Sequence, residues 1–499
     1  MFEPLIGGFA TAFSLTNLMA AGAGVLLGTL AGVLPGLGIA GTVAVLLPLT
    51  YSLDPLTALI LISGVFFGSQ YGGSTTSILV NIPGEATSVV TAIDGHAMAQ
   101  KGKAGKALGI AAIGSFVAGT MGIVALSFSA PTIARAALAF GPPEYFAVAV
   151  LGLVILASTF SKSPMRSLLM IIVGMMIGTI GLDPVLGASR FTMEFRVLDK
   201  GIDFVVMLMG VFGLAEIFAE IGRANERRES SSFAFRDLYP NRKELAQSAG
   251  PIVRGGVIGF LMGLIPGPSA IIATFASYAV EKRVSRTPDE FGKGALAGVA
   301  GPESANNSAM YAQMVPLISL GIPFSASMAL LLSGFVIHGL TPGPLLMVTN
   351  PDIFWGLIAS LYIGNVMLLI INLPLVGVFA SVLRVRFSIL LPLVTIVMFA
   401  GAYSINNSLF DLAVLLVFGI VGFFFRQAGL DLTALVLGAF LGPMIESSLT
   451  QALSMSNGSF AIFFTRPISG TILLVAIGLL VIALGLAARR WRTNEKPGI

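Results

Sequence analysis

Two polar segments interrupt an otherwise apolar chain and carry the side chains that could bind a ligand. The first, 68–88, reads GSQYGGSTTSILVNIPGEATS and is rich in hydroxyl and amide groups. Such groups can bind a carboxylate or a sodium ion without the desolvation penalty of a buried Lys or Arg. Isolated hydroxyls usually bond to their own helix, but four in a row beside a Gly-Gly step exceed that need. The candidate substrate-binding residues here are Tyr71, Gly72, Gly73, Ser74, Thr75, Thr76, Asn81, Pro83 and Gly84.

The second polar segment, 301–325, places a carboxylate beside two amides. Glu303 and Asn307 share one face of a helix at i, i+4, and Ser304 and Asn306 lie in the same turn. Oxygen ligands next to a broken helix are the materials of a sodium site or of a proton-carrying carboxylate. The candidate ion-coupling residues are therefore Glu303, Ser304, Asn306 and Asn307. The alternative is a helix start at the membrane surface, with Glu303 in water.

Two Pro-Gly steps at corresponding places predict that the chain has two related halves. Segments 28–36 and 259–267 both read G-x-x-x-G-x-x-P-G, and 71–83 and 311–323 both run from a tyrosine to Ile-Pro. A Pro-Gly step removes a backbone donor and loosens a helix, and broken helices at matching positions mark the midplane site of transporters. Half-helix N-termini there suit a carboxylate. This adds the substrate-binding candidates Gly36, Gly38, Pro266, Gly267, Gly321 and Pro323.

The glycines of the first motif also have a simpler interpretation. For Gly28 and Gly32 alone, we expect a close helix contact of the kind that small residues make in membranes. A Pro-Gly step could likewise be a kink that only shapes packing. The paired occurrence of the steps favours the binding site.

Composition requires that lipid surrounds most of the protein. The 499 residues are 56% hydrophobic and only 10% charged, with a mean hydropathy of +0.93, whereas soluble proteins carry about a quarter charged residues. Long apolar runs without period-2 alternation exclude a β-barrel. The prediction is an all-α polytopic membrane protein with about 11 to 14 membrane-embedded helices. With no cysteine and two histidines, disulfides and thiolate or histidine-rich metal sites are excluded.

The longest polar stretch divides the chain nearly in half. Residues 222–245 are rich in arginine and, with the other basic loops, are predicted to lie in the cytoplasm. We expect a first transmembrane repeat at 1–221, this loop, and a second repeat with C-terminal helices at 246–499. The repeats are expected to be inverted, with broken helices or re-entrant hairpins. The N-terminus has no cationic region, so no cleaved signal peptide is expected.

Long motifs now point to a known family. The chain resembles the TctA family, the large permease subunit of tripartite tricarboxylate transporters, in GTLAGVLPGLG (28–38), YGGSTTSILVNIPGEATSVVTAIDGHAMAQKGKAGKALG (71–109), GLIPGPSA (263–270), FGKGALAGVAGPESANNSA (291–309) and LGIPFSASMALLLSGFVIHGLTPGPLL (320–346). One departure is visible, because the family pattern reads GIPG where this chain has Phe324. That side chain could narrow the pocket or alter substrate preference.

The resemblance implies a multi-pass permease of the bacterial inner membrane. It would import small carboxylates (tricarboxylates, dicarboxylates or aromatic acids) by alternating access, driven by a Na⁺ or H⁺ gradient. Its partners would be a periplasmic solute-binding protein, a small four-helix membrane subunit and membrane lipid. No cofactor beyond the coupling ion and no nucleic acid are implied.

Two other hypotheses stay open at this point. A passive carboxylate channel is compatible with broken helices, although paired hairpins suit a closing site better. A membrane-embedded enzyme would need a convergent acid, base or metal set, which the chain supplies poorly because it has no Cys and no HExxH arrangement. We therefore expect a protein that is not an enzyme. The chain also has no Walker-type phosphate loop, which is consistent with secondary uptake driven by an ion gradient.

Overall fold

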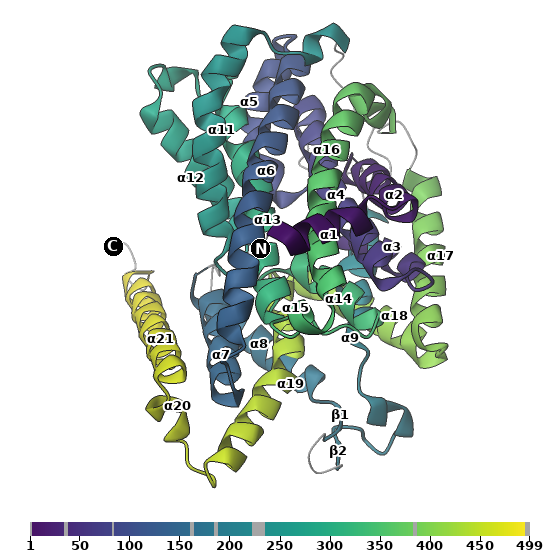
Figure 1. The fold of residues 1–499 in the computed structure, drawn as a ribbon, viewed down its shortest axis with the longest axis vertical. Coiled ribbons are helices and arrows are strands. Elements are labelled where there is room, and N and C mark those ends of the chain that lie inside the picture. Colours follow the sequence, from purple (N-terminus) through teal and green to yellow (C-terminus); the bar gives the residue numbers. More distant parts are fainter. Residues whose placement is uncertain are drawn as a thin grey trace.

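The computed structural model describes residues 2–33, 38–81, 84–159, 164–183, 188–221, 235–382 and 387–494, and these are nearly all helical (Figure 1). The helices before the polar loop are α1 (Phe2–Ala12), α2 (Leu15–Val33), α3 (Gly38–Leu46), α4 (Pro55–Val80), α5 (Val89–Gln100), α6 (Ala104–Ala137), α7 (Pro142–Thr159), α8 (Pro164–Gly178), α9 (Phe204–Leu208) and α10 (Ala215–Ile221). Those after it are α11 (Arg242–Gly263), α12 (Ser269–Val284), α13 (Ala297–Leu320), α14 (Ala326–Ile337), α15 (Leu346–Thr349), α16 (Pro351–Val382), α17 (Phe387–Asn406), α18 (Leu409–Gln427), α19 (Leu432–Met455), α20 (Ile462–Thr465) and α21 (Pro467–Asn494).

Short elements complete the chain. A π-helical turn, Met209–Leu214, joins α9 to α10, and 3-10 turns occupy Leu47–Thr50, Ala86–Ser88, Arg196–Lys200, Phe235–Leu238 and Pro288–Glu290. Within the described ranges the strands are β1 (Gly181–Leu182) and β2 (Ser189–Arg190), which pair antiparallel. The prediction of an all-α protein is confirmed.

Apolar helices long enough to cross a membrane form much of the described chain. Six of them meet the length and composition of a membrane span, in α2, α4, α6, α16, α18 and α19. Shorter apolar helices of 10–17 residues lie among them, including most of α7, α8, α14 and α17. This confirms the predicted polytopic membrane protein.

In the first half, glycines bring two helices into backbone contact. A Cβ on Gly28 of α2 would collide with the carbonyl oxygen of Val65 in α4, and a Cβ on Gly32 would collide with that of Ser69. The contacts advance in the same direction along both helices, so α2 and α4 run parallel. The chain between them, which includes α3, runs back in the opposite direction. The expected helix contact of Gly28 and Gly32 is therefore what the structure contains.

The second half repeats this arrangement. A Cβ on Gly259 of α11 would collide with the carbonyl oxygen of Ala305 in α13, and one on Gly263 with that of Ala309. Here too the two packed helices run parallel, and α12 returns between them. Helices α2, α3 and α4 thus correspond to α11, α12 and α13.

The two corresponding groups run in opposite directions where they meet. Phe67 of α4 stacks on Tyr311 of α13 with ring centroids 4.0 Å apart, whereas Ser74, further along α4, bonds to Glu303, earlier in α13. Helices α4 and α13 are therefore antiparallel, as inverted repeats require. The domain limits of 1–221 and 246–499 stay a prediction.

The turns after these central helices also match. α4 ends at Asn81 with φ 58°, and α13 ends at Gly321 with φ 74°, both left-handed. The next corresponding residues, Glu85 and Ser325, share φ −147° and ψ 164°. The backbone therefore has matching conformations where each turn begins and where it ends, although the side chains differ.

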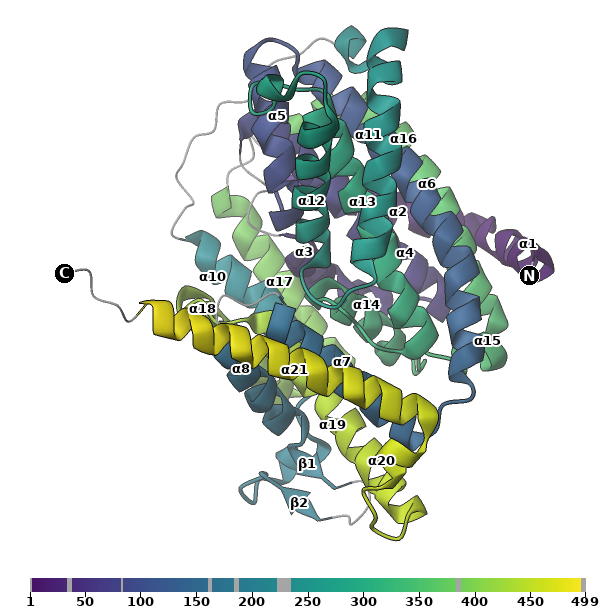
Figure 2. The same ribbon diagram turned by 90° about the vertical axis from the view of Figure 1, so that its left-hand side faces the viewer.

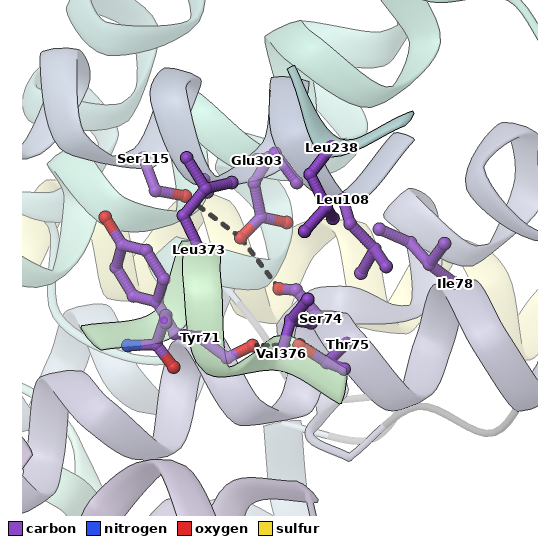
Figure 3. Close-up of a pocket in the computed structure, with 13 residues that line it drawn as sticks. Tyr71, Ser74, Thr75, Ile78, Leu108, Ser115, Leu238, Glu303, Leu373 and Val376 are labelled. Atoms are coloured by element: carbon purple, nitrogen blue, oxygen red, sulfur yellow. Dashed lines mark hydrogen bonds between the residues drawn. The ribbon is translucent and has the colours of Figure 1, made fainter. Parts of the chain in front are cut away.

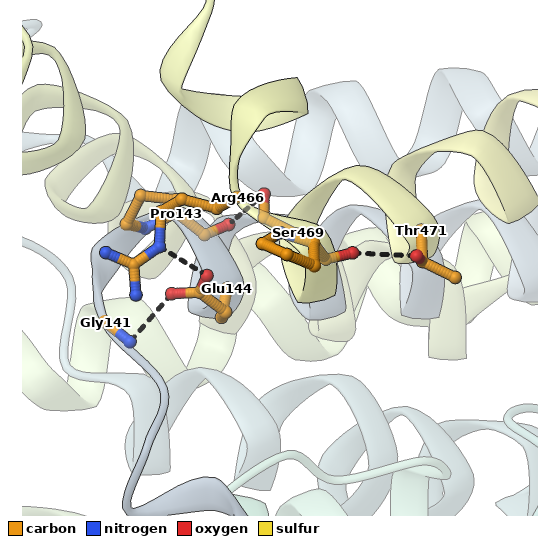
Figure 4. A network of polar contacts seen from close by, with 7 residues as sticks. Gly141, Pro143, Glu144, Arg466, Ser469 and Thr471 are labelled. Carbon is orange, nitrogen blue, oxygen red and sulfur yellow. Dashed lines mark hydrogen bonds and ion pairs between the residues drawn. The ribbon is translucent and has the colours of Figure 1, made fainter.

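A second layer of helices crosses below this bundle, formed by α7, α8, α19, α20 and α21 (Figure 2). Glycines again allow close packing, since a Cβ on Gly174 of α8 would collide with the carbonyl oxygen of Leu435 in α19. The buried carboxylate of Glu144 accepts a hydrogen bond from Arg466 Nε at 2.7 Å and so joins α7 to the start of α21 (Figure 4). The site described next lies in the first bundle.

Candidate functional site

Four helices converge on the carboxylate of Glu303 in α13. Oε1 accepts hydrogen bonds from Ser74 Oγ of α4 at 2.7 Å, from Ser115 Oγ of α6 at 3.2 Å and from Asn307 Nδ2 at 3.3 Å. Oε2 accepts one from Thr91 Oγ1 of α5 at 2.9 Å. The site joins residues more than 180 positions apart in the chain, so only the packing of the two halves creates it.

Glu303 is 1% exposed, so the alternative that leaves it in water at a helix start is wrong. Every residue of α13 from Gly298 to Ser319 is buried. A helix with this polar sequence can lie in a membrane only because other helices shield it from lipid. α4, which supplies Ser74, is buried almost as completely.

The Glu303 carboxylate differs from the other buried glutamates in its partners. Glu281 pairs with Arg254 through two hydrogen bonds of 2.8 and 2.6 Å, and Glu144 pairs with Arg466. In the part of the chain that the structure describes, Glu303 forms no ion pair, and its four donors are neutral. Its carboxyl group is therefore surrounded by neutral hydrogen-bond donors and lacks a cationic partner.

A small pocket opens beside this carboxylate (Figure 3). Its polar wall is formed by Tyr71, Ser74, Thr75, Ser115, Asn372 and Glu303, and its apolar wall by Ile78, Leu108, Ala111, Ala112, Leu238, Leu373 and Val376. The hydroxyl of Tyr71 is buried and makes no hydrogen bond with a described residue. The pocket therefore offers a free donor, a carboxylate and an apolar surface to one ligand.

The structure separates the predicted residues of the first polar segment into two groups. Tyr71, Ser74 and Thr75 line the pocket. Thr76 Oγ1 bonds back to the Gly72 carbonyl at 3.0 Å, which is the ordinary role of a helical hydroxyl. Of the others, Gly72 packs on α2, Gly73 and Gly84 face each other, Asn81 ends α4, and Gly38 begins α3.

The predicted residues of the second half lie at a different place. Gly267 N donates to the Phe324 carbonyl at 2.7 Å, so the Pro-Gly step after α11 closes on the turn after α13. Gln313 Nε2 donates to Ser269 Oγ at 3.1 Å, and Ser325 Oγ donates to Gln313 Oε1 at 2.7 Å. Residues Pro266, Gly267, Gly321 and Pro323 belong to this region and do not line the Glu303 pocket. Gly36 and Pro83 lie outside the described residues, and the roles of all these candidates stay predictions.

Among the ion-coupling candidates, the structure distinguishes two kinds. Asn307 holds the site together, since its amide also donates to Ser115 Oγ at 2.7 Å. Asn306 and Ser304 are completely buried but make no side-chain hydrogen bond with a described residue. Sequence reasoning missed Thr91 and Ser115, because a single hydroxyl in an apolar helix carries no signal of its partner.

A second carboxylate, which the sequence did not single out, fixes the start of α13. Asp94 Oδ1 accepts hydrogen bonds from the backbone N–H groups of Gly292, Gly294 and Ala295 at 2.9, 2.7 and 2.8 Å. Its Oδ2 accepts one from the Tyr278 hydroxyl at 2.9 Å. This buried contact ties α5 of the first half to the segment that leads into α13.

The sequence comparisons agree with this architecture. A family model described as "Tripartite tricarboxylate transporter TctA family" matches residues 18–437. The chain is 45% identical over 477 residues to the "Uncharacterized 52.8 kDa protein in TAR-I ttuC' 3'region" of Agrobacterium vitis, covering 96% of this chain and 95% of the relative. It is 44% identical over 228 residues to the "Uncharacterized protein in TAR-II ttuC' 3'region" of the same organism, covering 46% of this chain and 93% of the relative. No solved structure matches the chain.

Proposed function

Because this chain belongs to the TctA family of tripartite tricarboxylate transporters, we propose that it is the permease subunit of an ion-driven importer of small carboxylates. The substrate would be a tricarboxylate, a dicarboxylate or an aromatic acid, delivered by a periplasmic solute-binding protein. The pocket beside Glu303 is proposed as the place where transport is coupled to an ion gradient.

The single observation that carries this proposal is the buried carboxyl group of Glu303, which has no ion-pair partner among the described residues and lines a pocket between the halves. A carboxylate substrate entering this pocket brings a second negative charge. Two unit charges 4 Å apart repel by about 4 kcal/mol at an effective dielectric constant of about 20. A cation or a proton that enters with the substrate removes this repulsion, which is the physical basis of symport.

The walls of the pocket suit such a substrate. The free Tyr71 hydroxyl can donate to a substrate carboxylate, while Leu108, Leu373 and Val376 can contact its carbon skeleton. Neutral donors bind a carboxylate that must also be released, whereas a buried arginine would hold it more tightly.

The arrangement of the helices supports alternating access. The Glu303 hydrogen bonds join α4, α5, α6 and α13 into one unit. The layer of α7, α8 and α19 to α21 packs mainly within itself and crosses below that unit (Figure 2). We propose that the unit carrying Glu303 moves relative to this layer, in the manner of transporters built from inverted repeats.

Basic residues support an orientation in the bacterial inner membrane. Lys106 of α6 pairs with Glu244 of α11, and Lys101 Nζ donates to the Lys293 carbonyl at 2.5 Å. These contacts gather basic loops at one end of the bundle, which the positive-inside rule assigns to the cytoplasm. The opposite end would receive the binding protein, and the small four-helix subunit would pack against the permease within the membrane.

Uptake into proteoliposomes tests the proposal. The permease, co-purified with its small subunit, is reconstituted and supplied with binding protein and labelled citrate, succinate or an aromatic acid, with and without a sodium or proton gradient. We expect one class of acid to accumulate above its external concentration only when a gradient is present. Equilibration of the acid without any gradient dependence would identify a passive channel and overturn the proposal.

A further inference from the structure

Several buried polar atoms near the turn between α4 and α5 have no partner. Glu85 Oε1, Thr87 Oγ1 and both amide atoms of Asn306 make no hydrogen bond with any described residue. Asn306 is 0% exposed and Thr87 is 5% exposed. A buried polar group without a partner costs about 1–3 kcal/mol, so three such side chains together indicate a missing ligand.

These side chains lie where the turn Ala86–Ser88 packs against α13. The Glu85 carboxyl is close to Thr87 and to the Asn306 amide, but none of these contacts has the geometry of a hydrogen bond. The turn is held beside α4 because Ser77 Oγ donates to Ser88 Oγ at 2.7 Å and Ser88 Oγ donates to the Glu85 carbonyl at 2.9 Å. The first half and α13 of the second half therefore both contribute to the cluster.

A glycine leaves space for the carboxyl group. A Cβ on Gly73 would lie only 3.0 Å from Glu85 Cγ, so a side chain at Gly73 would press on the glutamate. Gln70, one turn earlier on α4, is 0% exposed, and neither of its amide atoms has a partner in the described structure. Since Phe67 and Ser74 of α4 lie opposite Tyr311 and Glu303, Gln70 lies at the level of Asn307 and Ser308, within one helical turn of Asn306.

The charge at this place calls for a cation. Glu303 is a second carboxyl group near Glu85, and neither forms an ion pair within the described ranges. The Glu303 oxygens are occupied by four donors, whereas Glu85 Oε1 is free. The cluster also lies near the C-terminal end of α4, where the helix dipole is negative.

We infer that Glu85, Thr87 and Asn306 form a binding site for a sodium ion, with Gln70 as a further oxygen ligand. This inference rests on the proposed ion-driven transport and names the ion and its ligands. Hydroxyl, amide and carboxylate oxygens suit a hard cation, and a single free carboxylate favours a monovalent one. A proton on Glu85 is the alternative, because a protonated carboxyl could donate to the Asn306 amide oxygen, and the sodium dependence measured below distinguishes the two.

Thermal unfolding of the purified full chain in detergent tests the site without any need for transport. Midpoints are measured against sodium chloride, at constant ionic strength made up with choline chloride. Wild type should become more stable as sodium rises, because a ligand that binds only the folded state stabilises it. Glu85→Gln and Thr87→Val should require about tenfold more sodium, or more, for the same shift.

Thr29→Val is the matched control, because Thr29 is a buried threonine of α2 whose hydroxyl only bonds back to the Val25 carbonyl at 2.8 Å. It should keep the wild-type sodium dependence. If Glu85→Gln does not fold, Thr87→Val decides, since it removes one ligand without changing charge. An unchanged sodium response in Thr87→Val or Glu85→Gln overturns the site, as does a wild-type midpoint that sodium and choline affect equally.

The two proposals can fail separately. If the vesicles accumulate no carboxylate but sodium stabilises wild type and not Glu85→Gln, the sodium site stands and the proposed transport fails. If carboxylate accumulates with a proton gradient alone and sodium has no effect on unfolding, the transport stands and the sodium site fails.

Discussion

Replacement of Glu303 by glutamine should separate the structural role of this residue from its role in coupling. Glutamine has nearly the same shape and can keep an oxygen where Oε1 accepts from Ser74, Ser115 and Asn307. Its amide would face Thr91 Oγ1, which can rotate and accept. Each of the four bonds weakens by about 1 kcal/mol when the acceptor loses its charge. The saved cost of burying an anion, several kcal/mol, offsets this loss, so the free energy of unfolding should change by less than about 2 kcal/mol.

Coupling should respond much more strongly than stability. The glutamine variant removes the charge that repels an entering carboxylate, a term of about 4 kcal/mol at 4 Å and a dielectric constant of about 20. Since 1.4 kcal/mol corresponds to a factor of ten, this term is equivalent to about 700-fold, and we expect the gradient-driven accumulation of substrate to fall by at least about tenfold. Exchange of internal for external substrate should persist, because the pocket keeps its shape.

The assay is proteoliposome uptake, scored as accumulation ratio with and without an ion gradient, beside thermal unfolding of the same preparation. Glu144→Gln is the matched control, since Glu144 is also a glutamate that is 1% exposed but lies in α7 and pairs with Arg466. It should leave the ion dependence unchanged. A Glu303→Gln protein that folds and accumulates substrate like wild type would refute the coupling role.

Substitutions at three further places test the packing around the site and its substrate preference. Asp94→Ala leaves three backbone N–H groups without an acceptor and should lower the free energy of unfolding by about 3 kcal/mol or more. Tyr278→Phe removes only one hydrogen bond and should lower it by about 1 kcal/mol. Chemical denaturation measures both changes. Gly28→Ala places a Cβ against a backbone carbonyl of α4 and should lower the unfolding midpoint and the folded yield, while Gly478→Ala, which meets open space, should not. Phe324→Gly should lower the free energy of unfolding by about 1–2 kcal/mol through lost packing and chain entropy. It should also shift the relative uptake of large and small acids. Equal preference in variant and wild type would exclude Phe324 from substrate selection.

The sequence predicted the elements of the fold more completely than their contacts. The all-α membrane class follows from composition, because few charged residues leave only lipid as a solvent. Glu303 was found because a carboxylate beside two asparagines is unusual in an apolar chain. Its donors Thr91 and Ser115 could not be found in this way, since the approach of α5 and α6 to α13 depends on packing over nearly 200 residues of chain.

The sequence also did not predict where the two proline-interrupted turns lie relative to each other. Their pairing in sequence suggested one shared site, and the backbone indeed repeats from Asn81 to Gly321 and from Glu85 to Ser325. Yet in antiparallel helices corresponding positions point to opposite ends, so the turn after α13 lies away from the Glu303 pocket. An inverted repeat brings the middles of its helices together, and sequence alignment of the halves does not reveal which positions meet.

The difference between the two turns has a physical consequence for coupling. In the second half, Gln313 on the helix and Ser325 on the turn bond to each other, and the turn is neutral and closed. In the first half, the corresponding positions are Gly73 and Glu85, which leave space beside α4 and a carboxyl oxygen without a partner among the described residues. A repeated backbone with one neutral and one charged turn can attract a cation to only one end of the central helices. Binding of that cation would tie the first turn to Asn306 beside Glu303, so the ion and the substrate would act on the same buried negative charge. The glutamate can be transferred to the second turn by Ser325→Glu with Gln313→Gly. We expect this change to create a competing cation site. It should not restore the sodium-dependent stabilisation lost in Glu85→Gln, because Asn306 and Glu303 face only the first turn.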